Sequence, residues 1–177
     1  GSQEAPVAAA MAFDAAPRME YRQANETRLE AARNISEWLL PQLPPESQVA
    51  VLDTRLGPAA FQVDRAAAAS LIARLEPVAN SRSLPDAIDE ALRLLAESDL
   101  ARKEVYVFTD MARAAWPADA AARLQQRAAQ LPEAMVYLID VGVKSPTNFG
   151  LGEPRLSAQR LSSLGTLRIE TELIRLG

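Results

Sequence analysis

Four short apolar segments, each followed by an aspartate, constrain the fold of this chain most strongly. They cover residues 7–13 before Asp14, 48–52 before Asp53, 104–109 before Asp110 and 134–139 before Asp140. Runs of this length and composition are typical of strands that are buried on both faces. Apolar residues at helical spacing separate them. The sequence therefore predicts an α/β, Rossmann-like domain with a mostly parallel central sheet and helices on both faces.

The expected helices begin at residues that cap helix N-termini. Thr27, Asp64 and Ser83 each stand just before an apolar stripe with helical spacing. Their side-chain oxygens can accept a hydrogen bond from a backbone N–H of the first turn. A fourth, alanine-rich helix is expected over residues 117–131, which end just before a proline.

One antiparallel edge strand is also expected. Phe61 and Val63 alternate with polar neighbours after a Gly57-Pro58 turn, and this pattern is typical of a short strand with one exposed face. The predicted order of elements is therefore β-α-β-β-α-α-β-α-β.

The pattern changes near the end of the chain. Residues 142–177 contain five basic and three acidic residues, a net charge of +2 against −4 for the whole chain. Glycines and prolines interrupt the first half of this segment, and residues 167–173 then alternate with the period of a strand. We expect residues 143–177 to be a β-rich tail. It forms either a linker and the first strands of a truncated β-sandwich or edge strands added to the first sheet.

Composition excludes several classes of function. The chain has no Cys and no His, which removes thiol and imidazole catalysis and the usual zinc sites. A net charge of −4 gives no electrostatic basis for binding nucleic acid. No apolar run reaches the length of a membrane span, so the piece itself is expected to be soluble. Gly1 and Ser2 are typical of a cloning scar, so residues 1–5 are assigned to this scar and a linker, and the chain is interpreted as part of a longer protein.

The strand-terminal aspartates are the candidates for a functional site. In an open α/β sheet ligands bind at the carboxyl ends of the strands, close to where the strand order reverses. Asp14 and Asp110 are therefore expected to share one site. The alternative interpretation is that each aspartate caps a helix or closes a turn.

The motifs around these residues resemble a von Willebrand factor A-like (vWA) domain. The resemblance rests on residues 7–13 followed by Asp14-Ala-Ala-Pro-Arg-Met, on Thr27-Arg-Leu-Glu-Ala-Ala, on Ser83-Leu-Pro-Asp-Ala-Ile and on Val105-Tyr-Val-Phe-Thr-Asp. It covers about residues 6–142. More narrowly, the chain resembles the vWA domain of BatA-like, aerotolerance-type bacterial membrane proteins, which have two N-terminal transmembrane helices. This implies a domain anchored to the inner membrane, on a side that the sequence does not define.

The resemblance also implies a position for a metal-ion-dependent adhesion site (MIDAS). In vWA domains an Asp-x-Ser-x-Ser loop, a Thr and a further Asp hold Mg²⁺. The corresponding residues here are Asp14, Ala16, Arg18, Ser83 and Asp110. Two hydroxyl ligands are lost, and a fixed guanidinium charge near the site opposes a divalent cation. We therefore predict a degenerate site without a cofactor, in which Arg18 pairs with Asp14 or Asp110. Weak Mg²⁺ binding through Asp14, Ser83 and Asp110 remains only if Arg18 turns to solvent.

The same end of the sheet carries candidate contacts for a protein partner. They are residues of types that are common in interfaces: Arg18, Met19, Tyr21, Arg113 and Trp116. The alternative for Trp116 is that it packs over the start of the helix at residue 117.

The predicted function is a non-catalytic protein-interaction module. One alternative is Mg²⁺-dependent, adhesion-type binding of a ligand through a residual MIDAS. A second is an aspartate-based phosphotransfer or phosphatase domain, but Ala16 stands where a dehalogenase-like site needs a second aspartate. Nucleotide binding is not indicated, because no glycine-rich loop follows the first strand.

Overall fold

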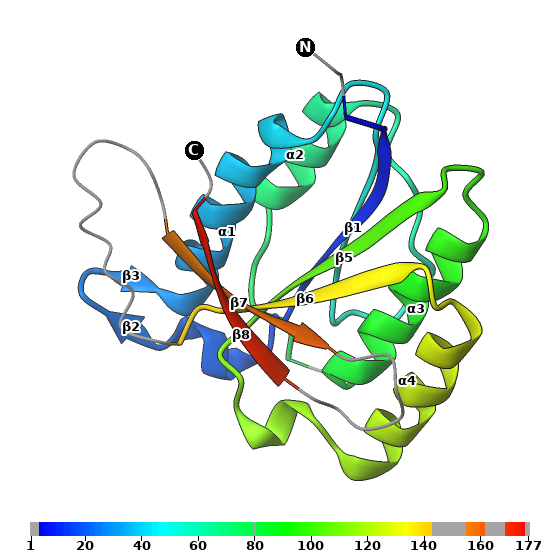
Figure 1. Ribbon diagram of the computed structural model, residues 1–177. Helices are drawn as coiled ribbons and strands as arrows, with labels where there is room; N and C mark the ends of the chain where they lie inside the picture. Colours follow the sequence, from blue (N-terminus) through cyan, green and yellow to red (C-terminus); the bar gives the residue numbers. More distant parts are fainter. Residues whose placement is uncertain (1–3, 80, 143–154, 162–168, 176–177) are drawn as a thin grey trace.

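The computed structural model describes residues 4–79, 81–142, 155–161 and 169–175, and it contains one six-stranded sheet with helices on both faces (Figure 1). The sheet order is β4-β1-β5-β6-β7-β8. The strands are β1 (Val7–Phe13), β4 (Gln48–Asp53), β5 (Arg102–Thr109), β6 (Ala134–Asp140), β7 (Arg155–Leu161) and β8 (Ile169–Arg175). The first four strands in this order are parallel, as the four apolar segments predict.

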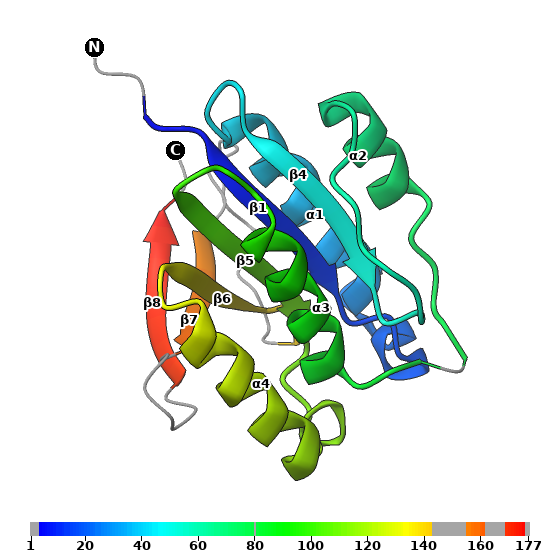
Figure 2. The same cartoon turned by 90° about the vertical axis from the view of Figure 1, so that its right-hand side faces the viewer.

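The helices form two layers. The α-helices are α1 (Arg28–Leu39), α2 (Arg65–Ala73), α3 (Leu84–Ala96) and α4 (Ala118–Gln130). Figure 2 shows α3 and α4 on one face of the sheet and α1 and α2 on the other. Shorter elements are the 3-10 turns η1 (Pro17–Glu20), η2 (Leu40–Gln42) and η3 (Arg113–Ala115) and the two-stranded hairpin of β2 (Arg22–Gln23) and β3 (Glu26–Thr27).

The three predicted N-caps are confirmed. The Thr27 hydroxyl accepts from the Glu30 N–H at 2.9 Å, and Asp64 accepts from the Ala67 N–H at 2.8 Å. The Ser83 hydroxyl accepts from the N–H three residues later at 3.3 Å. These bonds satisfy first-turn donors that have no partner within the helix.

Strand β1 lies at the centre of the molecule, and all seven of its residues are fully buried. Its alanines at alternate positions 8, 10 and 12 face α3, whereas Met11 and Phe13 belong to the core under α1 and α2. Small side chains on one face let α3 pack closely on the sheet, and the larger ones fill the opposite layer. Phe13 stacks on Phe108 of β5 with ring centroids 4.7 Å apart.

The predicted antiparallel edge strand over Phe61 and Val63 is shortened to a single bridge. One residue, Phe61, forms an antiparallel bridge to Ala50 of β4, and Val63 is 91% exposed. The physical reason is that Asp64 caps α2 immediately afterwards, so the chain turns into a helix before a ladder can extend. The antiparallel pairs lie elsewhere, between β6, β7 and β8 and in the β2–β3 hairpin.

The C-terminal strands extend the sheet rather than standing apart from it. β7 pairs with β6, and β8 pairs with β7, both antiparallel. The expected strand over residues 167–173 corresponds to β8, which begins at Ile169. β7 comes after the segment rich in glycine and proline. Residues 143–154 lie outside the described residues, and the division of the chain into domains stays a prediction.

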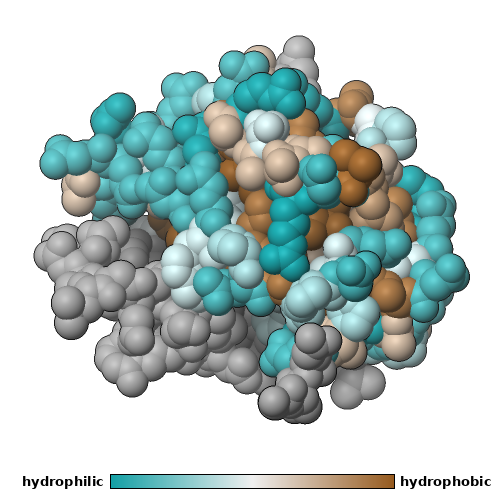
Figure 3. All heavy atoms as spheres, turned by 90° about the horizontal axis from the view of Figure 1, so that it is seen from above, coloured by the Kyte–Doolittle hydropathy of each residue, from teal (hydrophilic) through white to brown (hydrophobic). Residues whose placement is uncertain are grey.

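Figures 1 and 3 show the two ends of the parallel strands. Seen from above, where β1 begins, apolar side chains (brown) are visible between polar ones (teal) (Figure 3). The carboxyl ends of β1 and β5 lie at the other end of the molecule (Figure 1). The described part of the chain contains no helix long and apolar enough to cross a membrane.

The hairpin turn between β2 and β3 contains a backbone strain that a substitution can relieve. Ala24 and Asn25 have positive φ angles of 53° and 72°. Asn tolerates this region well, whereas Ala does so at a cost of about 1 kcal/mol. We expect Ala24→Gly to raise the free energy of unfolding by about 0.5–1 kcal/mol, measured by urea denaturation. The matched control is Ala122→Gly on the exposed face of α4, which should lower stability by about 1 kcal/mol. A destabilised Ala24→Gly variant would contradict this account.

Candidate functional site

Two buried carboxylates meet at the carboxyl end of the sheet. Asp14 follows β1 and Asp110 follows β5, and these strands are neighbours. The two side chains are 3% and 1% exposed. Such groups cannot remain charged at low cost without close partners.

The guanidinium of Arg18 provides that partner for both carboxylates. Its Nε and Nη2 donate to the two oxygens of Asp110 at 2.7 and 2.9 Å, a bidentate arrangement. Nη2 also donates to Oδ2 of Asp14. Arg18 reaches them because η1 turns the chain directly after β1 and returns this side chain over the strand ends.

A second arginine, Arg28, completes the cluster. Its Nη1 donates to Oδ2 of Asp110 at 2.8 Å, and its guanidinium carbon lies 4.7 Å from the centre of the Tyr21 ring. The Nε of Arg28 is buried and has no hydrogen-bond partner in the structure. We call Asp14, Arg18, Arg28 and Asp110 the salt-bridge cluster. Its two positive charges balance its two negative ones.

The ion pairs shift the pKa values of Asp110 and Arg18. Burial alone raises the pKa of Asp110, but the hydrogen bond from Arg18, the Ala112 N–H and the charges of both arginines outweigh it. The pKa of Asp110 therefore lies below its usual value. The hydrogen bond to Asp110 is the main reason that the pKa of Arg18 is raised. Both shifts favour the charged forms of Asp110 and Arg18.

Threonine hydroxyls and backbone groups hold the carboxylates in place. Thr109 donates from Oγ1 to Oδ2 of Asp14 at 3.1 Å, and the Ala16 N–H donates to Oδ1 at 3.1 Å. The hydroxyl of Thr54, which is 2% exposed, accepts from the Ala15 N–H at 3.3 Å. Thr54, Thr109 and Arg28 were not predicted as site residues. Their contacts join residues far apart in the sequence or depend on the conformation of a loop. The one available signal was that Thr109 directly precedes Asp110 in its strand.

Gly142 closes the cluster from the β6 side. A Cβ at this position would lie 3.0 Å from both Cβ and the backbone oxygen of Asp110. The N–H of Gly142 donates to Asp140 at 2.8 Å, and the Val141 N–H donates to the backbone oxygen of Thr109 at 2.9 Å. A side chain at this position would therefore have to displace Asp110 by a few tenths of an ångström.

The structure brings the side chains of three of the five predicted metal-site residues into contact. Asp14, Arg18 and Asp110 form the cluster, and Ala16 contributes only its backbone N–H. Ser83 does not join them: its hydroxyl caps α3, and among the described residues no hydrogen bond links it to either carboxylate. As a metal ligand, Ser83 would have to use the same hydroxyl oxygen that accepts the N-cap hydrogen bond of α3.

The predicted partner contacts divide between surface and core. Tyr21 is 60% exposed, and Arg113 is exposed on η3. Trp116 is half-buried and packs against the core beneath α3 and α4, in agreement with the packing alternative. Met19 is fully buried in the core on the α1 side, so its assignment as a partner contact is wrong. The reason is that η1 directs this side chain inward while Arg18 turns to the carboxylates.

The donor set does not fit a magnesium ion. Mg²⁺ prefers six oxygen ligands in octahedral geometry. Here Arg18 bonds to oxygens of both carboxylates that would have to face the metal. No group of three acidic, His or Cys side chains suited to a metal occurs among the described residues. Whether any metal binds stays a prediction.

Comparison with solved structures identifies the fold as that of vWA domains. A von Willebrand factor type A protein from Catenulispora acidiphila aligns with a TM-score of 0.60 at 17% identity, over 75% of this chain and 32% of the other. The SpRpn10 VWA domain aligns with a TM-score of 0.58 at 14% identity, over 74% of this chain and 72% of the other. Proximal thread matrix protein 1 from the mussel byssus aligns with a TM-score of 0.54 at 18% identity, over 76% of this chain and 35% of the other.

These identities support a shared fold and no more. This chain spans about a third of the length of the Catenulispora protein. No protein-family model and no curated protein matches the sequence.

Replacing Arg18 should destabilise the protein in a pH-dependent way. Arg18→Met leaves two buried carboxylates with only Arg28 to compensate their charge. We expect the free energy of unfolding to fall by about 2–4 kcal/mol at pH 7, a range that already allows for solvent screening of a side chain that is 26% exposed. Asp110 has a depressed pKa, so its contribution is present above the unfolded pKa of about 3.9 and is lost as pH falls through the folded value. The variant should therefore differ less from wild type at pH 3 than at pH 7 in urea unfolding.

The matched control is Arg22→Met. Its side chain is 66% exposed and its ion pair with Glu30 is 3.7 Å long, so the expected change is under about 0.5 kcal/mol. Equal effects of the two substitutions would show that the cluster contributes nothing specific.

Proposed function

We propose that this chain is a non-catalytic protein-interaction module in which a salt-bridge cluster replaces the metal ion of a vWA adhesion site. The observation that carries the proposal is the guanidinium of Arg18 bonded to both Asp14 and Asp110. A metal at this position would leave one coordination site open for a partner's carboxylate. The cluster instead uses fixed charges that already satisfy one another.

The cluster is proposed to act as a rigid support for the loops around it. It ties the loop after β1, the start of α1 and the loop after β5 to one point. Exposed Tyr21 and Arg113 belong to these segments, and Tyr and Arg are enriched at binding hot spots. Fixed loops lose less entropy when a partner binds. A partner that contacts this rim therefore meets a preorganised surface.

The state of Asp14 supports a non-catalytic role. Its Oδ2 accepts from Arg18 and Thr109, its Oδ1 accepts from the Ala16 N–H, and the side chain is 3% exposed. A phosphate-accepting carboxylate needs an accessible oxygen that can attack in line. The arrangement gives neither oxygen this freedom, which argues against the phosphotransfer alternative.

The wider context is also a proposal. The resemblance to BatA-like membrane proteins leads us to propose that the domain belongs to a longer bacterial protein anchored in the inner membrane.

A divalent-cation titration tests the absence of a metal site. We expect Mg²⁺ and Mn²⁺ to give no saturable heat with the wild-type protein in calorimetry, because Arg18 bonds to both carboxylates. The double variant Ala16→Ser with Arg18→Ser restores the Asp-x-Ser-x-Ser pattern and should gain saturable binding. Wild-type binding in the micromolar range that disappears in Asp14→Ala would instead support the Mg²⁺-dependent alternative.

A capture experiment tests the binding surface. Immobilised wild-type protein is compared with the double variant Tyr21→Ala, Arg113→Ala, using quantitative mass spectrometry of proteins retained from a bacterial lysate. A specific partner should be retained at least about tenfold less by the variant, in line with the weight of hot-spot residues. The control is Arg123→Ala on α4, whose side chain is 55% exposed. Retention unchanged by the double substitution would exclude this rim as the interface.

A further inference from the structure

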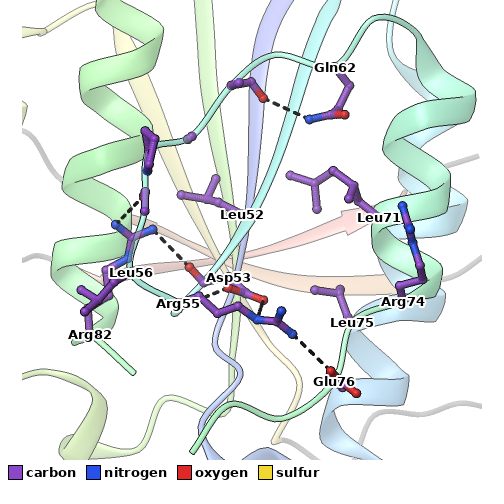
Figure 4. A pocket seen from close by; sticks show the side chains of 15 residues that line it. Leu52, Asp53, Arg55, Leu56, Gln62, Leu71, Arg74, Leu75, Glu76 and Arg82 are labelled. Carbon is purple, nitrogen blue, oxygen red and sulfur yellow. Dashed lines mark hydrogen bonds and ion pairs between the residues drawn. The ribbon is translucent and has the colours of Figure 1, made fainter. Parts of the chain in front are cut away.

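A second candidate site lies at the outer edge of β4, away from the salt-bridge cluster. A groove of about 560 Å³ runs along this edge between α2 on one side and the loop that leads to α3 on the other (Figure 4). Its volume is in the range of ligand sites in proteins. Leu52 and Asp53 of β4 form the floor, and Arg74 and Arg82 stand on opposite walls.

The backbone of β4 is only partly paired along this groove. β4 is the outermost strand on its side of the sheet and is covered on its free edge by the single Ala50–Phe61 bridge. The backbone oxygen of Val49 accepts from the Gln62 N–H at 2.8 Å, so Val49 directs its backbone groups outward. Because strands alternate with a period of two, Val51 and Asp53 direct theirs outward as well. The Asp53 oxygen already accepts from Nη2 of Arg82 at 3.4 Å, so among the described residues the Val51 oxygen and the Asp53 N–H are the groups left for pairing. The reduced edge strand therefore leaves a short template for an added strand.

The walls of the groove carry an excess of positive charge. Arg55 pairs with Asp53 at 3.2 Å and with Glu76 at 3.5 Å. Arg74 donates to the backbone oxygen of Ser70. Arg82 donates to the backbone oxygens of Gly57 and Asp53, each at 3.4 Å. Among the described residues neither Arg74 nor Arg82 forms an ion pair within 4 Å. Three arginines against two carboxylates thus give the lining a net charge of +1.

Apolar side chains lie between these charges. Leu71 and Leu75 of the α2 wall and Leu52 of the floor line the groove. Leu56 at the rim is 81% exposed, one of the three large hydrophobic side chains that the described surface leaves exposed. An exposed leucine beside a sheet edge and two arginines without an ion pair favour a ligand that is both apolar and anionic.

We propose that this groove binds an extended, acidic and aliphatic peptide segment of a partner protein. The segment adds to the outer edge of β4, where the backbone oxygen of Val51 and the N–H of Asp53 pair with it. Acidic side chains of the segment lie toward Arg74 and Arg82, and aliphatic ones contact Leu56 and Leu71. Backbone pairing provides affinity in this mode, and the side-chain pockets provide selectivity.

The same charges disfavour a second copy of this chain as the occupant. Pairing two β4 edges antiparallel would place the arginines of one groove opposite those of the other. Like charges directly opposite each other destabilise a strand pair. The complementary partner is therefore acidic.

Fluorescence anisotropy with labelled pentapeptides tests the proposal. The probe Val-Glu-Val-Glu-Val should bind saturably, whereas Val-Lys-Val-Lys-Val should not. Arg74→Gln should weaken binding at least about tenfold, as expected for loss of one charged contact, and Leu56→Ser should weaken it several-fold. Both side chains are exposed, so neither change should affect folding. The matched control Arg123→Gln on α4 should bind the probe like wild type.

Two further measurements identify the occupant. In an NMR titration the acidic probe should shift the amide resonances of Val51 and Asp53, and a proline at the central valine of the probe should remove binding because it lacks the N–H. The proposal is overturned by the absence of saturable binding up to 1 mM peptide, or by binding that Arg74→Gln leaves unchanged. It is also overturned if inorganic phosphate binds there and the peptide does not, or if sedimentation shows a dimer that Leu56→Ser dissociates. The variants at Tyr21, Arg113 and Arg18 leave this groove intact, so the two surfaces are tested separately.

Discussion

The burial of two carboxylates at the ends of adjacent strands is the constraint on which the rest of this site depends. Asp14 and Asp110 lie where β1 and β5 end, and both are almost inaccessible to water. Their charges are tolerable only because Arg18 and Arg28 bond to them directly. Satisfying them fixes the η1 turn, the start of α1 and the loop after β5. In the function proposed above, these two guanidinium groups take the place that a metal ion has in vWA adhesion sites.

How far the sequence predicted this arrangement depends on the range of each interaction. The parallel strands and three helix caps depend on local patterns, and Thr27, Asp64 and Ser83 cap helices as expected. The meeting of Asp14 and Asp110 follows from parallel topology. Arg28 could not be foreseen because its contact with Asp110 depends on how α1 is oriented over the sheet. Met19 was misassigned because a 3-10 turn reverses the direction of neighbouring side chains within four residues.

The edge of the sheet illustrates a competition between local signals. Alternating polarity near Phe61 favours a strand, but Asp64 is a strong helix cap only three residues later. The helix begins, the strand is reduced to one bridge, and the outer edge of β4 is left with backbone groups directed outward. In the β2–β3 hairpin, Ala24 and Asn25 form the turn without the glycine that usually reveals such a turn in a sequence.

The close packing of Gly142 on Asp110 has a mechanical consequence. This glycine connects the parallel part of the sheet to residues 143–177, and it touches the backbone of the residue that anchors both arginines. Tension transmitted along the chain from those residues would act on Gly142 and, through the Val141–Thr109 hydrogen bond, on the end of β5. A displacement of Gly142 would therefore reach Asp110 and the loop that follows it.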